Sequence, residues 1–227
     1  NEYTASQKEI VLNEETSKHV VQVLRMKGGE QLNLTDGKGS LITCEITGDH
    51  KKHCTVEVKK TSFKEQGTRK ISVAISLLKN ANRFEWFLEK ATEIGVAEII
   101  PLICERTEKE KFRQDRMQGI VVSAMLQSQQ IWLPVLREPV QYANIQMWKC
   151  VNGSNFIAHC DKGNKQSLHQ QTNSTTHLLI SIGPEGDFTP EEIELALQNN
   201  FIPVSLGETR LRTETAGVVA ATLLRIN

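Results

Sequence analysis

Residues 178–215, LLISIGPEGDFTPEEIELALQNNFIPVSLGETRLRTET, decide the fold of this chain. The stretch opens with an apolar run, residues 178–182, that is short and stops at Gly183-Pro184, as a buried parallel strand should. A second apolar run, residues 202–206, stops at Gly207. Parallel strands that end in glycine loops bring those loops to one edge of a sheet, where α/β proteins bind ligands. The sequence therefore predicts a binding crevice between the two loops.

A helix is predicted between these two strands. Thr189 has the position of an N-cap, Pro190 that of the first helical residue, and Glu192 follows three residues after the cap, which is the capping-box pattern. The helix should run to about residues 199–200. The turn before it, residues 183–187, contains two glycines that we expect to take backbone angles barred to other residues. Thr213 is expected to cap the last helix.

Composition sets modest limits. The chain has 227 residues, enough for one large domain or two small ones, and 27 basic residues balance 27 acidic ones. The chain therefore has no net positive charge that would favour binding of nucleic acid, although residues 51–70 hold seven lysines and arginines. That cluster can be a phosphate-binding surface or only a solvated face. No apolar run approaches the length of a membrane span, and the first residues carry no signal-peptide pattern, so a soluble cytoplasmic protein is predicted.

Five cysteines are present, and none of them has CxxC spacing: Cys44, Cys54, Cys104, Cys150 and Cys160. An odd number of scattered cysteines argues against a disulfide framework and against a zinc site. We expect reduced, mostly buried thiols and no metal.

Residues 1–70 are predicted to form a small β-rich domain. Residues 31–35 and 41–46 alternate around Asp36-Gly37, which is a hairpin signal, and residues 54–59 alternate once more. Several short strands suggest a small barrel. Residues 14–24 should form a short helix with Val20, Val23 and Leu24 on one face, and residues 59–70 should form a polar linker.

Residues 71–227 alternate between strands and helices, which predicts a parallel α/β sheet. Strands are expected at residues 71–78, 97–103 and 156–159, besides the two described above. Helices are expected at residues 82–94, ended by Gly95, and at residues 114–131. The first carries its apolar side chains on one stripe, namely Phe84, Phe87, Leu88, Ala91 and Ile94. Residues 162–176 are polar and should form a surface loop.

Two common phosphate-binding motifs are absent, because no GxGxxG follows a strand and no GxxxxGK[ST] occurs. The glycine turn at residues 183–187 can hold an anion on the helix N-terminus, or it can be only a tight turn. The second loop changes this balance, because it places Arg210, Arg212 and Glu214 near the first.

At this point the chain resembles a known family. The pattern IGPEGxF…LG…LRTETA is similar to the SPOUT methyltransferases, and specifically to the bacterial small-subunit ribosomal RNA uridine N3-methyltransferases of the E type. His19, Val23-Leu24-Arg25, Gly28-Gly29-Glu30 and Asp36-Gly37 resemble the PUA-like RNA-binding barrel of that family. Residues 83–96, with Pro101 and Glu105-Arg106, resemble its helix motif and the strand and loop beyond. Two positions depart from the pattern: Asp187 stands where the family usually has glycine, and Gln130 where it commonly has arginine.

The resemblance implies a PUA-like β-barrel over residues 1–70 and a SPOUT α/β domain with a deep trefoil knot over residues 71–227. It also implies S-adenosylmethionine as the methyl donor, an obligate homodimer, and ribosomal RNA within the assembled 30S subunit as the substrate. The small residues of the last helix, 216–224, suit a partner surface or a buried core equally. The implied cofactor-binding residues are Ile182, Gly183, Pro184, Gly186, Leu206, Gly207, Leu211, Arg212, Thr213 and Thr215.

The chemistry suggests roles for several charged residues. Methyl transfer is an in-line displacement that needs alignment, and loss of the N3 proton puts negative charge on the uracil carbonyls. Arg212 is the candidate to stabilise that charge, or else a loop anchor paired with Glu214. Glu185 or Glu214 is the candidate base, unless each only orders its loop or an external base acts.

RNA contact is expected from His19, Arg25, Lys27 and Arg106, although a packed or hydrogen-bonded His19 is favoured over a catalytic one. Two alternatives remain for the whole protein. One is a SPOUT enzyme that methylates ribose 2′-oxygens of rRNA or tRNA, and the other is a non-catalytic dimeric RNA-binding protein.

Overall fold

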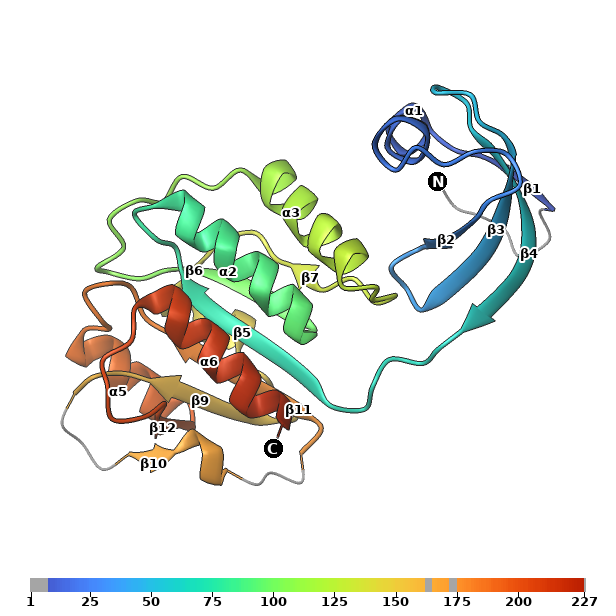
Figure 1. Ribbon diagram of the computed structural model, residues 1–227. Coiled ribbons are helices and arrows are strands. Elements are labelled where there is room, and N and C mark those ends of the chain that lie inside the picture. Colours follow the sequence, from blue (N-terminus) through green and yellow to red (C-terminus); the bar gives the residue numbers. More distant parts are fainter. Residues whose placement is uncertain (1–7, 162–164, 172–174, 227) are drawn as a thin grey trace. The chain divides into compact units, whose positions relative to one another are not determined.

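The computed structural model describes residues 8–161, 165–171 and 175–226. Its internal contacts divide the chain into two compact units between Gln66 and Gly67 (Figure 1).

The first unit is a curved antiparallel sheet with a short helix (Figure 1). Its strands are β1 (Glu9–Val11), β2 (Gln31–Thr35), β3 (Ser40–Gly48) and β4 (Thr55–Phe63), paired in the order β1-β4-β3-β2. The predicted hairpin is confirmed, since β2 and β3 pair from Gln31↔Glu45 to Thr35↔Leu41. β4 is longer than predicted and reaches Phe63, so the first half of the expected linker is strand. The end of β4 has no apolar alternation of its own, and it is a strand because it pairs with β3.

The helix of this unit differs from the prediction. α1 (Glu14–Lys18) is capped by the Asn13 side chain, which accepts the Thr16 N–H at 2.8 Å, and it continues as a π-helical turn, His19–Val23. The Leu24 N–H donates to the His19 carbonyl at 2.9 Å, five residues back. This wider turn rotates the side chains that follow it away from the face they would occupy in a regular α-helix. Val20 is buried, but Val23 and Leu24 are 66% and 54% exposed, so the expected common apolar face is wrong.

The second unit contains one extended sheet in which every pairing between described strands is parallel, as predicted. The strand order is β10-β12-β9-β11-β5-β6-β7, with β8 also paired to β6. The strands are β5 (Lys70–Ser76), β6 (Glu98–Ile103), β7 (Val135–Leu136), β8 (Val140–Gln141), β9 (Ser154–Ala158), β10 (Gln166–Ser167), β11 (His177–Ile182) and β12 (Phe201–Ser205).

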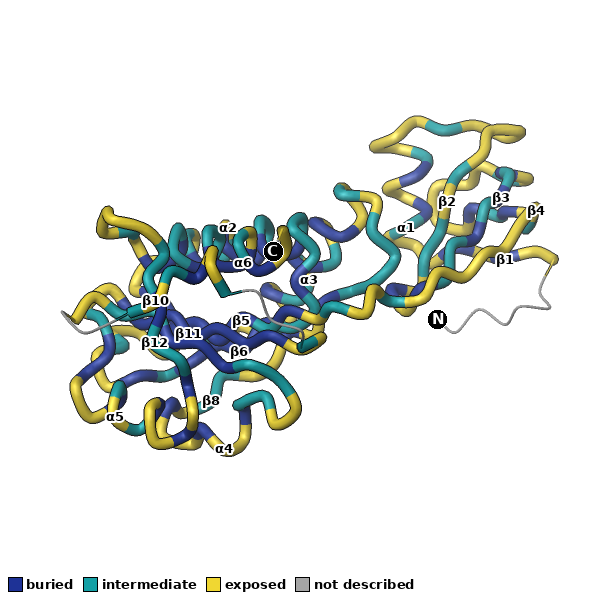
Figure 2. Tube along the Cα trace, turned by 90° about the horizontal axis from the view of Figure 1, so that it is seen from below, coloured by how far each residue is buried: buried dark blue, intermediate teal, exposed yellow. Residues whose placement is uncertain are grey.

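Helices cover both faces of this sheet. α2 (Ala81–Ile94), α3 (Gln114–Gln127) and α6 (Thr213–Ile226) lie on one face, and α4 (Ile145–Trp148) and α5 (Pro190–Gln198) lie on the other (Figure 2). Each face has its own apolar core. The predicted stripe of α2 is buried at Phe84, Phe87, Leu88 and Ala91, and Gly95 ends the helix with φ 87°. Short 3-10 turns occur at Tyr142–Asn144 and Leu168–Gln170.

α3 is shorter than predicted, because it ends at Gln127 and not at residue 131. Gln129 takes φ 55°, which turns the chain out of the helix. The Gln130 side chain then donates to the carbonyls of Thr92 (2.6 Å) and Glu93 (3.2 Å) in the last turn of α2. Gln130, which departs from the family pattern, therefore closes the end of a neighbouring helix.

The expected loop at residues 162–176 is also partly wrong. β10 adds to the sheet edge beside β12, and Leu168 is fully buried. Residues 162–164 and 172–174 of that loop lie outside the described residues.

α6 begins one residue earlier than predicted, so Thr213 is its first residue and not its cap. The Ala216 N–H donates to the Arg212 carbonyl at 2.7 Å, which makes Arg212 the residue before the helix. Gly217, Ala220, Ala221 and Leu224 face the chain's own core. A Cβ built on Gly217 would lie 2.6 Å from a Phe87 ring atom, so α6 packs closely on α2. None of the described helices is long and apolar enough to cross a membrane.

Candidate functional site

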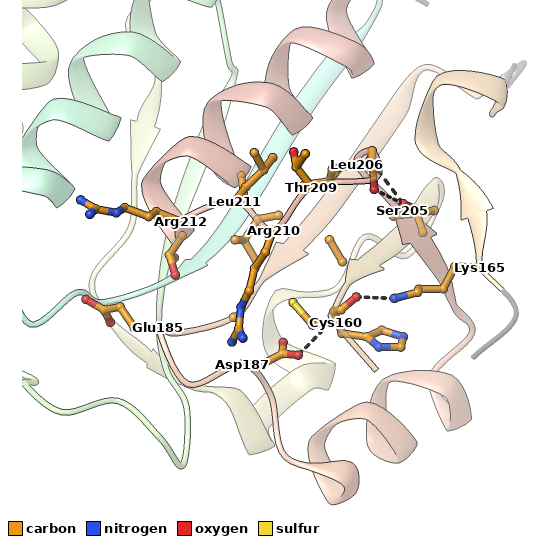
Figure 3. Close-up of a pocket in the computed structure, with 18 of the residues that line it drawn as sticks. Cys160, Lys165, Glu185, Asp187, Ser205, Leu206, Thr209, Arg210, Leu211 and Arg212 are labelled. Atoms are coloured by element: carbon orange, nitrogen blue, oxygen red, sulfur yellow. Dashed lines mark hydrogen bonds between the residues drawn. The ribbon is translucent and has the colours of Figure 1, made fainter. Parts of the chain in front are cut away.

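A pocket of about 680 Å³ opens at the carboxyl ends of β9, β11 and β12 (Figure 3). Both predicted glycine loops line it, so the predicted crevice between them is present. The lining residues come from three segments and the start of α6: Ala158, His159, Cys160 and Lys165; Ile182, Gly183, Pro184, Glu185 and Asp187; Val204, Ser205, Leu206, Gly207, Glu208, Thr209, Arg210, Leu211 and Arg212; Thr213 and Ala216.

The first loop is a tight turn closed by the Asp187 N–H, which donates to the Pro184 carbonyl at 3.0 Å. Positive φ was expected at its glycines, but the residue that takes it is Asp187, at 64°. Gly183 is needed for space instead, because a Cβ there would lie 3.0 Å from the Phe188 ring. The position at which this chain lacks the family's glycine is thus the one position of the turn whose backbone favours glycine.

The capping box after this turn is confirmed. Thr189 Oγ1 accepts the Glu192 N–H at 3.3 Å, and Glu192 Oε2 accepts the Thr189 N–H at 2.9 Å. The second carboxylate oxygen of Glu192 accepts the N–H of Glu105, in the loop after β6, at 2.9 Å. One buried carboxylate therefore joins two loops at the same sheet edge.

Arg106 joins the same two loops. Its Nη1 donates to the Gly186 carbonyl at 2.7 Å and to the Phe188 carbonyl at 3.4 Å. Its side-chain carbons pack over Gly186, where a Cβ would lie 3.3 Å from Arg106 Cδ. The expected place of Arg106 at the ligand-bearing edge is confirmed, but the guanidinium binds main-chain carbonyls of the first glycine loop.

The second loop combines a glycine, in a backbone conformation that other residues rarely adopt, with exposed charges. Gly207 takes φ 142°, and its carbonyl accepts from Ser205 Oγ at 2.9 Å. Leu206 and Leu211 are partly buried, whereas Arg210 and Arg212 are exposed. Within the described part of the chain, the Arg212 guanidinium makes no hydrogen bond or ion pair. Figure 3 shows Arg212 and Glu185 at one end of the pocket and Lys165 at the other.

Glu214 does not line the pocket and does not pair with Arg212. It is buried beside Arg83 of α2, with Arg83 Nε 3.7 Å from Glu214 Oε1, and its Oε2 has no hydrogen-bond partner among the described residues. Gly186 and Thr215 also do not line the pocket; the other eight predicted cofactor residues do.

The third wall of the pocket was missed by the sequence reasoning. It consists of Ala158, His159, Cys160 and Lys165, at and beyond the end of β9. The signal was present, because a strand was predicted there and its carboxyl end had to reach the same edge. Burial lowers the pKa of His159, and the nearby Lys165 lowers it further, so a neutral imidazole is favoured in this wall.

The other predicted RNA-contacting residues lie in the first unit. His19, Arg25 and Lys27 are all exposed, so the alternative of a packed His19 is wrong. Arg25 takes φ 57°, directly after the π-helical turn. In the described part of the chain, no group of three or more His, Cys, Asp or Glu side chains could hold a metal ion.

Comparison with known families gives two matches that together cover most of the chain. An RNA methyltransferase domain model matches residues 64–225, and an RNA methyltransferase PUA domain model matches residues 12–59. The chain is 30% identical over 217 residues to the "Ribosomal RNA small subunit methyltransferase E" of Synechocystis sp., which covers 92% of this chain and 69% of that protein.

Solved structures agree with these matches. A probable rRNA-methyltransferase from Porphyromonas gingivalis is 37% identical, with a TM-score of 0.85 over 93% of this chain and 90% of its own. A methyltransferase from Legionella pneumophila, solved with the cofactor SAM bound, is 31% identical, with a TM-score of 0.88 over 100% of this chain and 94% of its own.

Proposed function

This chain belongs to the RNA methyltransferase family, and we propose that it transfers a methyl group from S-adenosylmethionine to small-subunit ribosomal RNA. The observation that carries the proposal is the pocket itself, which lies inside the matched methyltransferase domain and is built from the two glycine loops. The known SAM complex of a relative with the same fold supports the choice of cofactor.

The residues of the pocket fit this cofactor. Its volume lies within the range of small-molecule sites, about 300–1,000 Å³. Ile182, Leu206 and Leu211 offer apolar surface for an adenine ring, and the glycine loops expose main-chain groups for its polar edge. A charged side chain for the carboxylate of an amino-acid moiety lies elsewhere on the wall, at Arg210. The cofactor supplies a methyl group on a sulfonium centre. We assign its binding to Ile182, Gly183, Pro184, Leu206, Gly207, Leu211 and Thr213, with the Arg212 side chain at the rim left for the substrate. Gly186 lies in the first glycine loop and Thr215 in the first turn of α6.

For the acceptor we infer N3 of a uridine. As its proton leaves, negative charge spreads onto the two flanking carbonyl oxygens, and a guanidinium can stabilise that charge. Arg212 suits this role because it is exposed at the pocket rim and its guanidinium is free to bind substrate. Glu185 lies at the same end of the pocket (Figure 3) and is therefore the better candidate base. Glu214, held beside Arg83, positions the start of α6.

RNA binding outside the pocket is assigned to the PUA-like unit. His19, Arg25 and Lys27 are exposed there and can contact phosphates. Arg106 acts indirectly, by holding the first glycine loop. The further parts of the proposal are a homodimer with the trefoil knot of the SPOUT fold, a cytoplasmic location, and the assembled 30S subunit as substrate.

Two measurements test the proposal. Calorimetry should show S-adenosylmethionine binding to the purified protein. Unmethylated 30S subunits incubated with protein and cofactor should then yield 3-methyluridine when their RNA is digested to nucleosides and analysed by mass spectrometry. A 2′-O-methylated nucleoside would assign the chain to the ribose-methylating alternative. Failure to bind cofactor would leave only the non-catalytic RNA-binding one.

A further inference from the structure

One peptide group in the pocket wall is held by two side chains of opposite charge. Lys165 Nζ donates to the His159 carbonyl at 2.6 Å, and the Cys160 N–H donates to Asp187 Oδ2 at 2.7 Å (Figure 3). The carbonyl of His159 and the N–H of Cys160 belong to the same peptide unit. Both of its polar atoms therefore make charge-assisted hydrogen bonds, which are stronger than neutral ones.

Asp187 is placed for this contact by its own backbone. Its φ of 64° lies in the left-handed region, where Asp and Asn are the side chains best tolerated after glycine. Oδ1 accepts the N–H of Phe188 at 2.9 Å, which fixes the carboxylate orientation and leaves Oδ2 for Cys160. The residue thus links the first glycine loop to the segment after β9, 27 residues away in sequence.

The held peptide matters because of its location. His159, Cys160, Lys165 and Asp187 all line the pocket, and the described residues between β9 and β10 form no helix or strand that would fix them. Without Asp187 and Lys165, ordering of this wall would have to come from the ligand. A wall ordered before binding spares the ligand that entropic cost.

We propose that Asp187 and Lys165 are positioning residues that preform the third wall of the S-adenosylmethionine pocket by holding the 159–160 peptide. This proposal rests on the proposed function for the identity of the ligand. The hydrogen-bonded arrangement itself is independent of it.

The first test needs no cofactor. Cys160 is the only exposed one among the five cysteines, so a thiol reagent such as Ellman's reagent should modify it first. In Asp187→Gly the backbone angle is kept and the hydrogen bond to Cys160 is lost, so modification should be about fivefold faster or more. Asp187→Asn removes the same charge and keeps one oxygen, which can accept the N–H of Cys160 or that of Phe188 but not both. It should therefore react more slowly than Asp187→Gly but faster than wild type, which separates loss of the bond from loss of charge beside the thiol.

The second test is cofactor affinity by calorimetry. Asp187→Gly and Lys165→Met should each bind S-adenosylmethionine about tenfold more weakly, and Asp187→Asn within about threefold of wild type. Because both side chains hold one peptide, the double variant should lose much less than the product of the single losses. Glu138→Gln, at an exposed residue outside the pocket, is the control and should bind as wild type does.

The outcomes separate the two proposals. Asp187→Gly with wild-type thiol reactivity and wild-type affinity would overturn the positioning role, as would equal defects in the Asn and Gly variants. Wild-type protein that binds no S-adenosylmethionine would refute the proposed function instead. The thiol rates would then still decide whether Asp187 orders the wall.

Discussion

Replacing Glu192 by glutamine should destabilise the second unit far more than the same change at Glu191. Glu192 is only 9% exposed, and its carboxylate accepts the N–H groups of Thr189 and Glu105, each at 2.9 Å. Glutamine has nearly the same shape but only one acceptor oxygen. Its NH₂ group must then face one of the two N–H groups.

The cost follows from these contacts. Thr189 is 5% exposed, so its N–H cannot turn to water, and a buried donor left unpaired costs about 1–3 kcal/mol. Loss of a carboxylate from the first turn of α5 adds about 0.3–1 kcal/mol. We therefore expect about 2–3 kcal/mol for Glu192→Gln. Glu191 is exposed in the same turn, so Glu191→Gln should lose only the smaller contribution.

The assay can report on the second unit alone. All three tryptophans, Trp86, Trp132 and Trp148, lie after Gly67, so their fluorescence follows the unfolding of that unit in urea. With a denaturant dependence of about 2 kcal/mol per molar urea, the midpoint should fall by about 1 M for Glu192→Gln and by less than about 0.5 M for Glu191→Gln. Equal midpoints for the two variants would refute the role given to the buried carboxylate.

Three further outcomes are expected. Arg212→Lys should lower the single-turnover methylation rate on 30S subunits about 10²–10³-fold at saturating cofactor, with cofactor affinity nearly unchanged; a near wild-type rate would remove Arg212 from the mechanism. Gly207→Val should weaken cofactor binding, because φ 142° is strained for a branched residue, whereas Gly67→Val, whose Cβ meets no atom within 4 Å, should bind normally. Arg116→Met should lower the urea midpoint slightly at pH 7, because Arg116 pairs with both oxygens of Glu85 (2.6 and 2.8 Å) and so lowers its pKa. A lowered folded-state pKa stabilises the protein above the unfolded-state pKa, so the difference in urea midpoint should shrink as the pH falls below about 4, and a pH-independent difference would contradict this.

The elements that the sequence predicted well are those with local signals. α5 begins at Pro190, and its start could be predicted because the capping box needs only Thr189 and Glu192. α2 ends at Ile94 because the next residue, Gly95, adopts a left-handed conformation. β10 could not be predicted in this way. Gln166 and Ser167 are polar, and they form a strand only because β12 lies beside them.

The same distinction holds for the site. Its place at the ends of β11 and β12 followed from a general rule about parallel sheets, and the rule needed no side-chain detail. The third wall follows β9, where residues 159–165, HCDKGNK, match none of the motifs considered in the sequence. The hydrogen bond between Asp187 and Cys160 joins the loop after β11 to the segment after β9, so no local sequence pattern could indicate it.

Two polar residues near the site share one unexpected property. Arg106 and Asp187 each bind main-chain groups of another segment. A site made of loops exposes many unpaired N–H and C=O groups, and these must be satisfied for the loops to hold one shape. Polar side chains close to such a site are therefore often engaged by the backbone. The better candidates for substrate contact are charged groups at the rim whose hydrogen bonds are still open, and among the described residues Arg212 meets that condition while Glu214, beside Arg83, does not. This contrast supports a transition-state role for Arg212 and a positioning role for Glu214.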